Sequence, residues 1–211
     1  LARQFVFTLR ATVDSGFGRQ RAVNISTSKD FVEWSDPVLM FAADARDQEL
    51  GAAWLQRVAG DPAYRQPLIN DPNQYNTQVY NMAAFPYEGI YLGMPTMFRN
   101  SGRSDEVPWG DGFSVPGLAV SPDLRQWQFA LDEERPDFLP ISPVGEGVFD
   151  TAQIEPPSRP IRIGDELFFY YTGLKFRSIS AEGASAIHLA RLRLDGFVNV
   201  ELAHTCRRQR D

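Results

Sequence analysis

The 211-residue sequence predicts an all-β domain built from repeated antiparallel units, and three observations support this prediction. Aromatic residues make up 12% of the chain, and 16 Gly and 15 Pro residues accompany them, a composition typical of strands joined by tight turns. Short alternating or apolar runs recur along nearly the whole sequence. A Ser-x-Asp-x-x-x-Trp turn occurs twice, at 28–34 and at 121–127, in matching positions between strand-like runs.

The first third of the chain contains three predicted strands and one predicted helix. Gly16 and Gly18 mark the turn between the first two strands, and Asp30 suits the turn before the third, because its side chain can bond nearby backbone amides. Residues 42–66 hold ARDQELGAAWLQRVAG, the one stretch with helical composition, so we expect a short helix there. An irregular loop is the alternative. The predicted strands cover 4–11, 21–28 and 37–41.

The remaining strands are separated by polar, Gly-rich or Pro-rich segments. Two strands within 78–98 are joined by a turn at 87–89, and 99–111 and 133–147 are expected to be loops. A turn at Asp195-Gly196 separates the last two strands. The other predicted strands cover 113–121, 128–131, 151–155 with a continuation at 160–163, 166–176, 187–193 and 197–202.

These strands form an internal repeat. A full copy covers about 78–131, a variant covers about 151–202, and a copy that lacks its first strand covers about 4–41. Four sequential antiparallel strands per repeat describe the blades of a β-propeller. The alternative is a β-sandwich whose turns coincide by chance. The repeat therefore predicts a single partial β-propeller domain over residues 1–211.

Four segments of the sequence resemble the five-bladed β-propeller glycosidases of glycoside hydrolase families 32 and 43. They are SKDFVEWSDP, AVSPDLRQW, GDELFFYYTG and IHLARLRLDGFVNVE. A complete propeller of this type needs about five repeats, and the chain holds about two and a half. The resemblance therefore implies a fragment from the later blades, as does the strand-like start LARQFVFTLRA. It also implies hydrolysis of glycosidic bonds, with furanosides as one substrate class.

In the family that the chain resembles, three acidic residues surround a central funnel on the innermost strands. The acid/base glutamate motif matches Glu155, although here a proline follows the glutamate directly. Asn81 stands where the family has an aspartate, and the first-blade acid is expected upstream of Leu1. The sequence N-D-P-N around Asp71 spells the family's nucleophile motif, but it is also a generic turn sequence, so a turn is the alternative.

The residues themselves also point to carboxylate chemistry. Glu155 follows Ile154 in an apolar strand, where partial burial would raise its pKa and suit a general acid. The alternative is a strand-end glutamate bonded to backbone amides or to Arg159 or Arg162. Asp150 is a second candidate for the funnel, or else a cap at the start of the strand. We predict Glu155 and Asp150 as catalytic residues.

Candidate sugar-binding residues lie near these acids in the predicted repeats. Asn81 and Gln153 carry amides that can bond sugar hydroxyls, and Tyr80 and Trp109 carry rings that can stack on a sugar face. Core packing is the alternative for both aromatic residues. Asp71 completes the predicted set.

Other functional classes receive little support from the sequence. The net charge of −6 argues against nucleic acid or an anionic membrane as the partner, and no apolar run is long enough to span a bilayer. His188 and His204 lack companion ligands at zinc-binding spacing, so we expect neither a metal nor a cofactor. Cys206 is the only cysteine, which excludes a disulfide within the chain.

Three functions are therefore considered: a glycosidase, a carbohydrate-binding propeller without catalysis, and a propeller that serves as an interaction scaffold. The resemblance implies an extracellular or periplasmic location, with the cytoplasm as the alternative. The sequence leaves the oligomeric state open.

Overall fold

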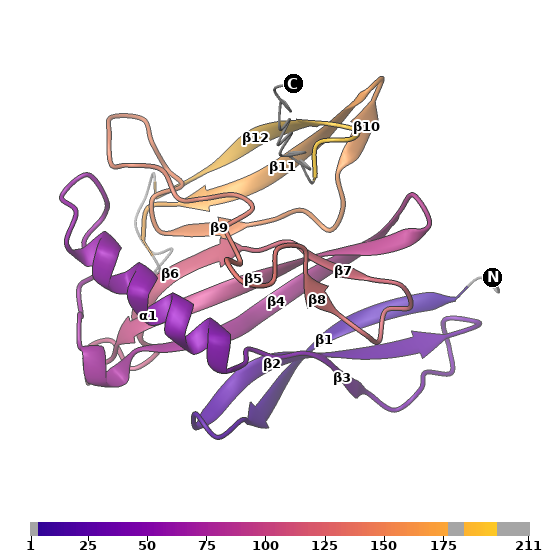
Figure 1. The fold of residues 1–211 in the computed structure, drawn as a ribbon, viewed down its shortest axis with the longest axis horizontal. Coiled ribbons are helices and arrows are strands. Elements are labelled where there is room, and N and C mark those ends of the chain that lie inside the picture. The colour runs from indigo at the N-terminus through magenta and orange to yellow at the C-terminus, as the bar shows by residue number, and fades with distance from the viewer. Residues whose placement is uncertain (1–3, 177–183, 198–211) are drawn as a thin grey trace, which may run out of the picture.

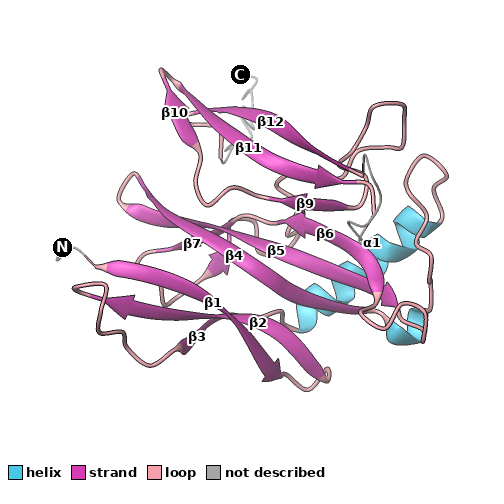
Figure 2. Cartoon of the chain, turned by 180° about the vertical axis from the view of Figure 1, so that it is seen from behind, coloured by secondary structure: helices cyan, strands magenta, loops and turns pink. Residues whose placement is uncertain are grey.

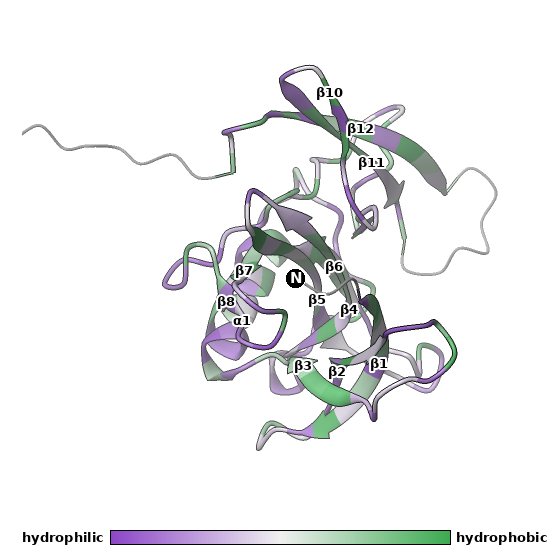
Figure 3. Cartoon of the chain, turned by 90° about the vertical axis from the view of Figure 1, so that its right-hand side faces the viewer, coloured by the Kyte–Doolittle hydropathy of each residue, from purple (hydrophilic) through white to green (hydrophobic). Residues whose placement is uncertain are grey.

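The computed structural model describes residues 4–176 and 184–197. This part of the chain is mostly β-structure, as predicted, and its strands form a three-stranded and a nine-stranded sheet. Strands β10–β12 lie to one side of β4–β8, and β1–β3 lie to the other (Figure 1 and Figure 3). The grouping of these strands into propeller blades stays a prediction.

The three-stranded sheet follows the chain order and contains β1 (Phe5–Asp14), β2 (Arg19–Ser28) and β3 (Val38–Phe41). The first two strands pair along their whole length as an antiparallel hairpin. Gly16 and Gly18 in the connecting turn have φ angles of 81° and 83°, a conformation that glycine adopts without steric cost.

The nine-stranded sheet begins with the long hairpin of β4 and β5. Both β6 and β7 also pair with β5, so the predicted strand over 113–121 is interrupted at Gly117 and Leu118. The prediction of a loop at 99–111 is wrong for its first residues, because β5 continues to Gly102. Residues of that extension pair with β6 and are buried. The strands are β4 (Asn76–Tyr87), β5 (Ile90–Gly102), β6 (Asp111–Pro116), β7 (Ala119–Ser121) and β8 (Gln128–Phe129).

The last strands of the same sheet centre on β11. Both β9 and β10 pair with one edge of β11, as the predicted continuation of the strand implies, and β12 pairs with the other edge. A parallel pair between Ser114 and Gln153 joins β6 to β9. The predicted strand at 197–202 lies, beyond Phe197, outside the described residues. The strands are β9 (Gln153–Glu155), β10 (Ile161–Ile163), β11 (Glu166–Leu174) and β12 (Ser185–Arg193).

The predicted helix is present as α1 (Ala45–Ala59), which packs against β4 and β5 (Figure 2). It begins with a capping box, in which the side chains of Asp44 and Asp47 each accept a hydrogen bond from the other's backbone amide. Leu55 and Val58 face a buried cluster that includes Phe113 and Ile154. The helix therefore covers apolar side chains of the nine-stranded sheet.

The repeated Ser-x-Asp turn has the same hydrogen bonds in both copies. Ser28 Oγ accepts from the amides of residues 30 and 31, and Ser121 Oγ accepts from those of residues 123 and 124. Asp30 and Asp123 each accept from the amides two and three residues later. The residue after each aspartate has a φ angle of 68°. Both aspartates are thus turn-forming, as the sequence predicted.

Candidate functional site

Glu155 is the last residue of β9 and is joined to β4 by its side chain. Its Oε2 accepts a hydrogen bond of 3.1 Å from Asn81 Nδ2. Asn81 Oδ1 in turn accepts a 2.6 Å hydrogen bond from Thr96 Oγ1, and Thr96 is fully buried. This second bond fixes the orientation of the amide, so that its NH₂ group points at the carboxylate of Glu155.

A β-bulge in β4 places Asn81 beside Glu155. The pairing between β4 and β5 shifts between Val79 and Met82, so that Tyr80 and Asn81 together stand opposite the single residue Thr96. Such a bulge bends the strand and redirects a side chain. The bulge therefore lets Asn81 bond both Thr96 and Glu155.

The environment of Glu155 favours its protonated form. Burial raises the pKa of Glu155, and the hydrogen bond from Asn81 offsets part of that effect. Among the described residues no cation forms an ion pair with this carboxylate, and Arg162 instead donates to the carbonyl of Gly164. A half-buried carboxyl group without a cationic partner suits proton donation.

Asp150 lies on the opposite face of β11 from Glu155. Glu155 pairs with Thr172, so both side chains point to one face, whereas Tyr171 and Gly173 face the other. Asp150 accepts a 2.9 Å hydrogen bond from the Tyr171 hydroxyl, and a Cβ on Gly173 would come within 2.7 Å of Asp150 Cβ. The two predicted catalytic carboxylates are thus not brought together.

The surroundings of Asp150 form a packed cluster. Burial, and then the hydrogen bond to Asp150, raise the pKa of Tyr171. The Tyr171 ring stacks on His188 with centroids 5.1 Å apart and planes 14° apart. Asp150 is 6% exposed. Asp150 is thus a buried side chain that is hydrogen-bonded within a packed cluster beside β11.

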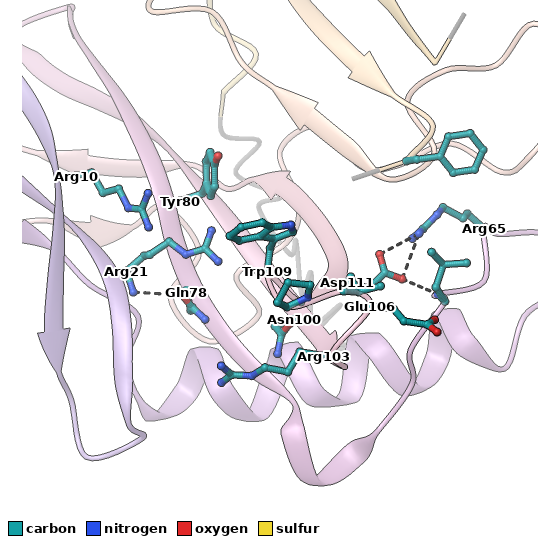
Figure 4. A pocket seen from close by; sticks show the side chains of 15 residues that line it. Arg10, Arg21, Arg65, Gln78, Tyr80, Asn100, Arg103, Glu106, Trp109 and Asp111 are labelled. Atoms are coloured by element: carbon teal, nitrogen blue, oxygen red, sulfur yellow. Dashed lines mark hydrogen bonds and ion pairs between the residues drawn. The ribbon is translucent and has the colours of Figure 1, made fainter. Parts of the chain in front are cut away.

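Tyr80 and Trp109 line a cleft of about 840 Å³ between the β1–β2 hairpin, β4 and the loop after β5 (Figure 4). Trp109 is 79% exposed and Tyr80 is 39% exposed, so neither is a core residue. The polar side chains of Gln78 and Asn100 also face this cleft. Tyr80 precedes Asn81, so the bulge of β4 connects the cleft with the Glu155 contact.

Arginines dominate the charged lining of the cleft, and none of them was among the residues predicted from the sequence. Arg65 and Asp111 form a buried ion pair at one end, with distances of 3.0 and 3.2 Å from Nη2 to the two carboxylate oxygens. Figure 4 shows this pair beside the labelled residues. The other arginines of the lining are Arg10, Arg21 and Arg103. They come from three separate segments, and no local sequence motif links them.

The remaining predicted residues lie elsewhere. Gln153 is half-buried within β9 and does not line the cleft. Asp71 caps the 3₁₀ helix η1 (Pro72–Gln74), accepting from the Asn73 amide at 3.0 Å and from Gln74 Nε2 at 2.8 Å. These two bonds lead the causes that lower the pKa of Asp71. The turn alternative for Asp71 is therefore what the structure contains.

The described residues hold no group of three or more His, Cys, Asp or Glu side chains placed to bind a metal ion. Within the same residues, the helix is too short and too polar to cross a membrane.

No protein-family model matches the sequence, and no curated protein shows significant similarity to it. Solved structures do show similarity in fold. A β-1,2-mannobiose phosphorylase from Listeria innocua matches with a TM-score of 0.46 and 17% identity, over 90% of this chain and 38% of its own. An N-acetylgalactosamine deacetylase from F. plautii, solved with blood group B trisaccharide, matches with a TM-score of 0.45 and 18% identity, over 89% of this chain and 46% of its own.

A GH32 β-fructofuranosidase from Bombyx mori matches with a TM-score of 0.42 and 15% identity, over 91% of this chain and 32% of its own. The chain thus spans less than half the length of each of these three proteins. The solved structures that the chain matches thus include a glycoside phosphorylase and a glycosidase, and the likeness is one of fold.

Proposed function

We propose that the chain forms blades of a five-bladed β-propeller that cleaves glycosidic bonds. The blades correspond to the repeats at about 4–41, 78–131 and 151–202. The observation that carries the proposal is Glu155, a carboxyl group at the end of β9 whose pKa is raised by burial and whose position is fixed by Asn81. Furanosides are the substrate class that the sequence resemblance implies.

In this proposal Glu155 is the general acid. Its proton passes to the glycosidic oxygen as the bond from that oxygen to the anomeric carbon breaks, and the leaving sugar departs as an alcohol. A second carboxylate attacks the anomeric carbon or activates water there. Asp150 does not supply this group, because it faces away from Glu155. In this proposal another residue of the active protein supplies the second carboxylate.

In this proposal the cleft lined by Tyr80 and Trp109 provides the other elements of a sugar site. Tyr80 and Trp109 offer aromatic faces, which suit the C–H surface of a sugar ring. The amides of Gln78 and Asn100 line the same cleft and are each hydrogen-bonded within the protein, and each keeps further capacity to bond a sugar hydroxyl. Asn81, which follows Tyr80 in β4, holds the carboxyl group of Glu155 by a hydrogen bond. Gln153, two residues before Glu155 and on the same face of β9, is a further candidate for bonding substrate hydroxyls.

A carbohydrate-binding protein without catalysis is the second candidate, and Asn81 favours it. Where the family that the sequence resembles has an aspartate, this chain places an amide in direct contact with Glu155. A protein that only binds sugar needs hydrogen-bond donors and no pair of carboxylates. Retention of binding without turnover would support this second function.

The test is hydrolysis of a panel of furanosides and pyranosides by the full-length protein and its Glu155→Gln variant. The glycosidase proposal predicts turnover of at least one substrate and its loss in the variant, with Glu134→Gln, an exposed glutamate, as the matched control. Equal turnover by wild type and Glu155→Gln would refute the role of Glu155. If wild type, Glu155→Gln and Glu134→Gln all bind a sugar and none of them turns it over, the carbohydrate-binding function is supported.

A further inference from the structure

The cleft that contains Tyr80 and Trp109 is electropositive, although the chain carries a net charge of −6. Its lining includes four arginines but only two carboxylates, Glu106 and Asp111. Asp111 is already engaged by Arg65. The remaining arginines therefore present positive charge to whatever occupies the cleft.

Arg10 and Arg21 lie on the same face of the β1–β2 hairpin. Thr12 pairs with Arg21, and Arg10 is two residues from Thr12, so all three side chains point the same way. Burial and the nearby charge of Arg10 both lower the pKa of Arg21. Neither arginine forms an ion pair with any described residue. Two close cations without a carboxylate between them favour an anion in that position.

Arg21 is held in place by its surroundings. Its backbone amide donates to Gln78 Oε1 at 3.2 Å, and its guanidinium lies 5.2 Å from the Tyr80 ring centre and 4.9 Å from that of Phe98. Stacking of this kind restricts the guanidinium plane, so less freedom is lost when it bonds a ligand. Arg103 lines the same cleft and forms no ion pair with the residues that the structure describes.

We propose that this cleft binds an anionic sugar unit, in which Arg10 and Arg21 hold a carboxylate and Tyr80 and Trp109 face the ring. A guanidinium matches a carboxylate in shape and can donate two parallel hydrogen bonds to it. The aromatic lining and the volume of about 840 Å³ favour a sugar acid over inorganic phosphate alone. The inference rests on the proposed function and extends it, because it names the substrate class as glycans that contain uronic acid.

The experiment measures binding of short oligogalacturonides and oligoglucuronides, each against its methyl ester, by isothermal titration calorimetry. The methyl ester keeps the ring and removes the charge. Using the full-length Glu155→Gln variant prevents turnover and makes the result independent of catalysis. We expect the acid to bind on the order of tenfold more tightly than the ester in at least one series, because charge-assisted bonds to arginine are strong.

Arg10→Gln combined with Arg21→Gln should abolish this preference while leaving binding of the ester within about twofold of the parent protein. Arg125→Gln, which removes an exposed arginine from the Ser121–Trp127 turn, is the matched control and should keep the preference. If the wild type turns over no substrate while the acid still binds more tightly than the ester, the glycosidase proposal is refuted and the anion site is supported.

Three results would overturn the assignment of the cleft to a sugar acid. The first is equal affinity for acid and ester in both series, which includes binding of neither. The second is a preference that survives in the Arg10 and Arg21 variant. The third is a special case of the first, in which inorganic phosphate binding depends on these two arginines, and it would assign the cleft to phosphate in place of a sugar acid.

Discussion

Removing the carboxylate charge of Asp111 should destabilise the protein strongly. Arg65 and Asp111 are 8% and 2% exposed, and Asp111 also accepts a 2.6 Å hydrogen bond from the Leu68 amide. Asp111→Asn leaves the guanidinium of Arg65 buried without its counterion, and breaking such a pair costs about 3–5 kcal/mol. For a chain of this size that corresponds to a fall of roughly 6–20 °C in melting temperature.

The assay is urea unfolding, with the free energy of unfolding compared between wild type and Asp111→Asn. Glu49→Gln is the control, because the Arg46–Glu49 pair is exposed and its loss should cost less than about 1 kcal/mol. The double variant Arg65→Gln with Asp111→Asn should cost less than the sum of the single variants, since neither charge is then left alone. Equal losses for Asp111→Asn and Glu49→Gln, or additive single effects, would refute this reasoning.

Three further predictions concern other parts of the fold. Gly173→Ala should cost about 1–3 kcal/mol, because its Cβ would stand 2.7 Å from that of Asp150; an unchanged melting temperature would contradict the packing described. Hydrogen bonds from the amides of residues 126 and 125 lower the pKa of Asp123 in the folded protein. The ionised side chain therefore stabilises the fold at pH values above the unfolded pKa of about 3.9, and this stabilisation is lost as the pH falls through the lower folded pKa. The melting temperature should therefore fall less for Asp123→Asn than for wild type between about pH 6 and about pH 3. Parallel curves of melting temperature against pH for the two proteins would argue against this assignment. Asn81→Asp should raise the pKa of Glu155 by adding a like charge beside it, measured by NMR titration of the glutamate carboxyl carbon; an unmoved titration would show that the two side chains do not touch in solution.

Local sequence patterns predicted most of the secondary structure. The Ser-x-Asp turns and the glycine turn at 16–18 depend on hydrogen bonds or backbone angles within a few residues, so their sequences suffice to identify them. The helix is also predicted, because helical composition is a local property of the sequence. The extension of β5 to Gly102 was missed. Its polar, Gly-rich sequence is typical of a loop, and only the pairing with β6 makes it a strand.

The candidate site depends on contacts that no local pattern reveals. Asn81 and Glu155 are 74 residues apart, and the bulge that brings them together is visible only in the pairing of β4 with β5. Asp150 is predicted as a second funnel acid from its position at the start of an apolar strand, whereas strand alternation places Asp150 and Glu155 on opposite faces of β11. The arginines of the cleft were not predicted, because only the fold brings their separate segments together.

The proposed role of Glu155 as general acid is tested most directly by how its removal depends on the leaving group. A sugar or alkyl alcohol needs a proton as it departs, whereas dinitrophenolate does not, so kcat/KM of Glu155→Gln should fall about 10²–10⁴-fold for an alkyl glycoside and by less than about tenfold for the dinitrophenyl glycoside of the same sugar. Equal losses for both substrates would show that the side chain acts through structure or binding. No loss for either would contradict the proposed function of this residue altogether.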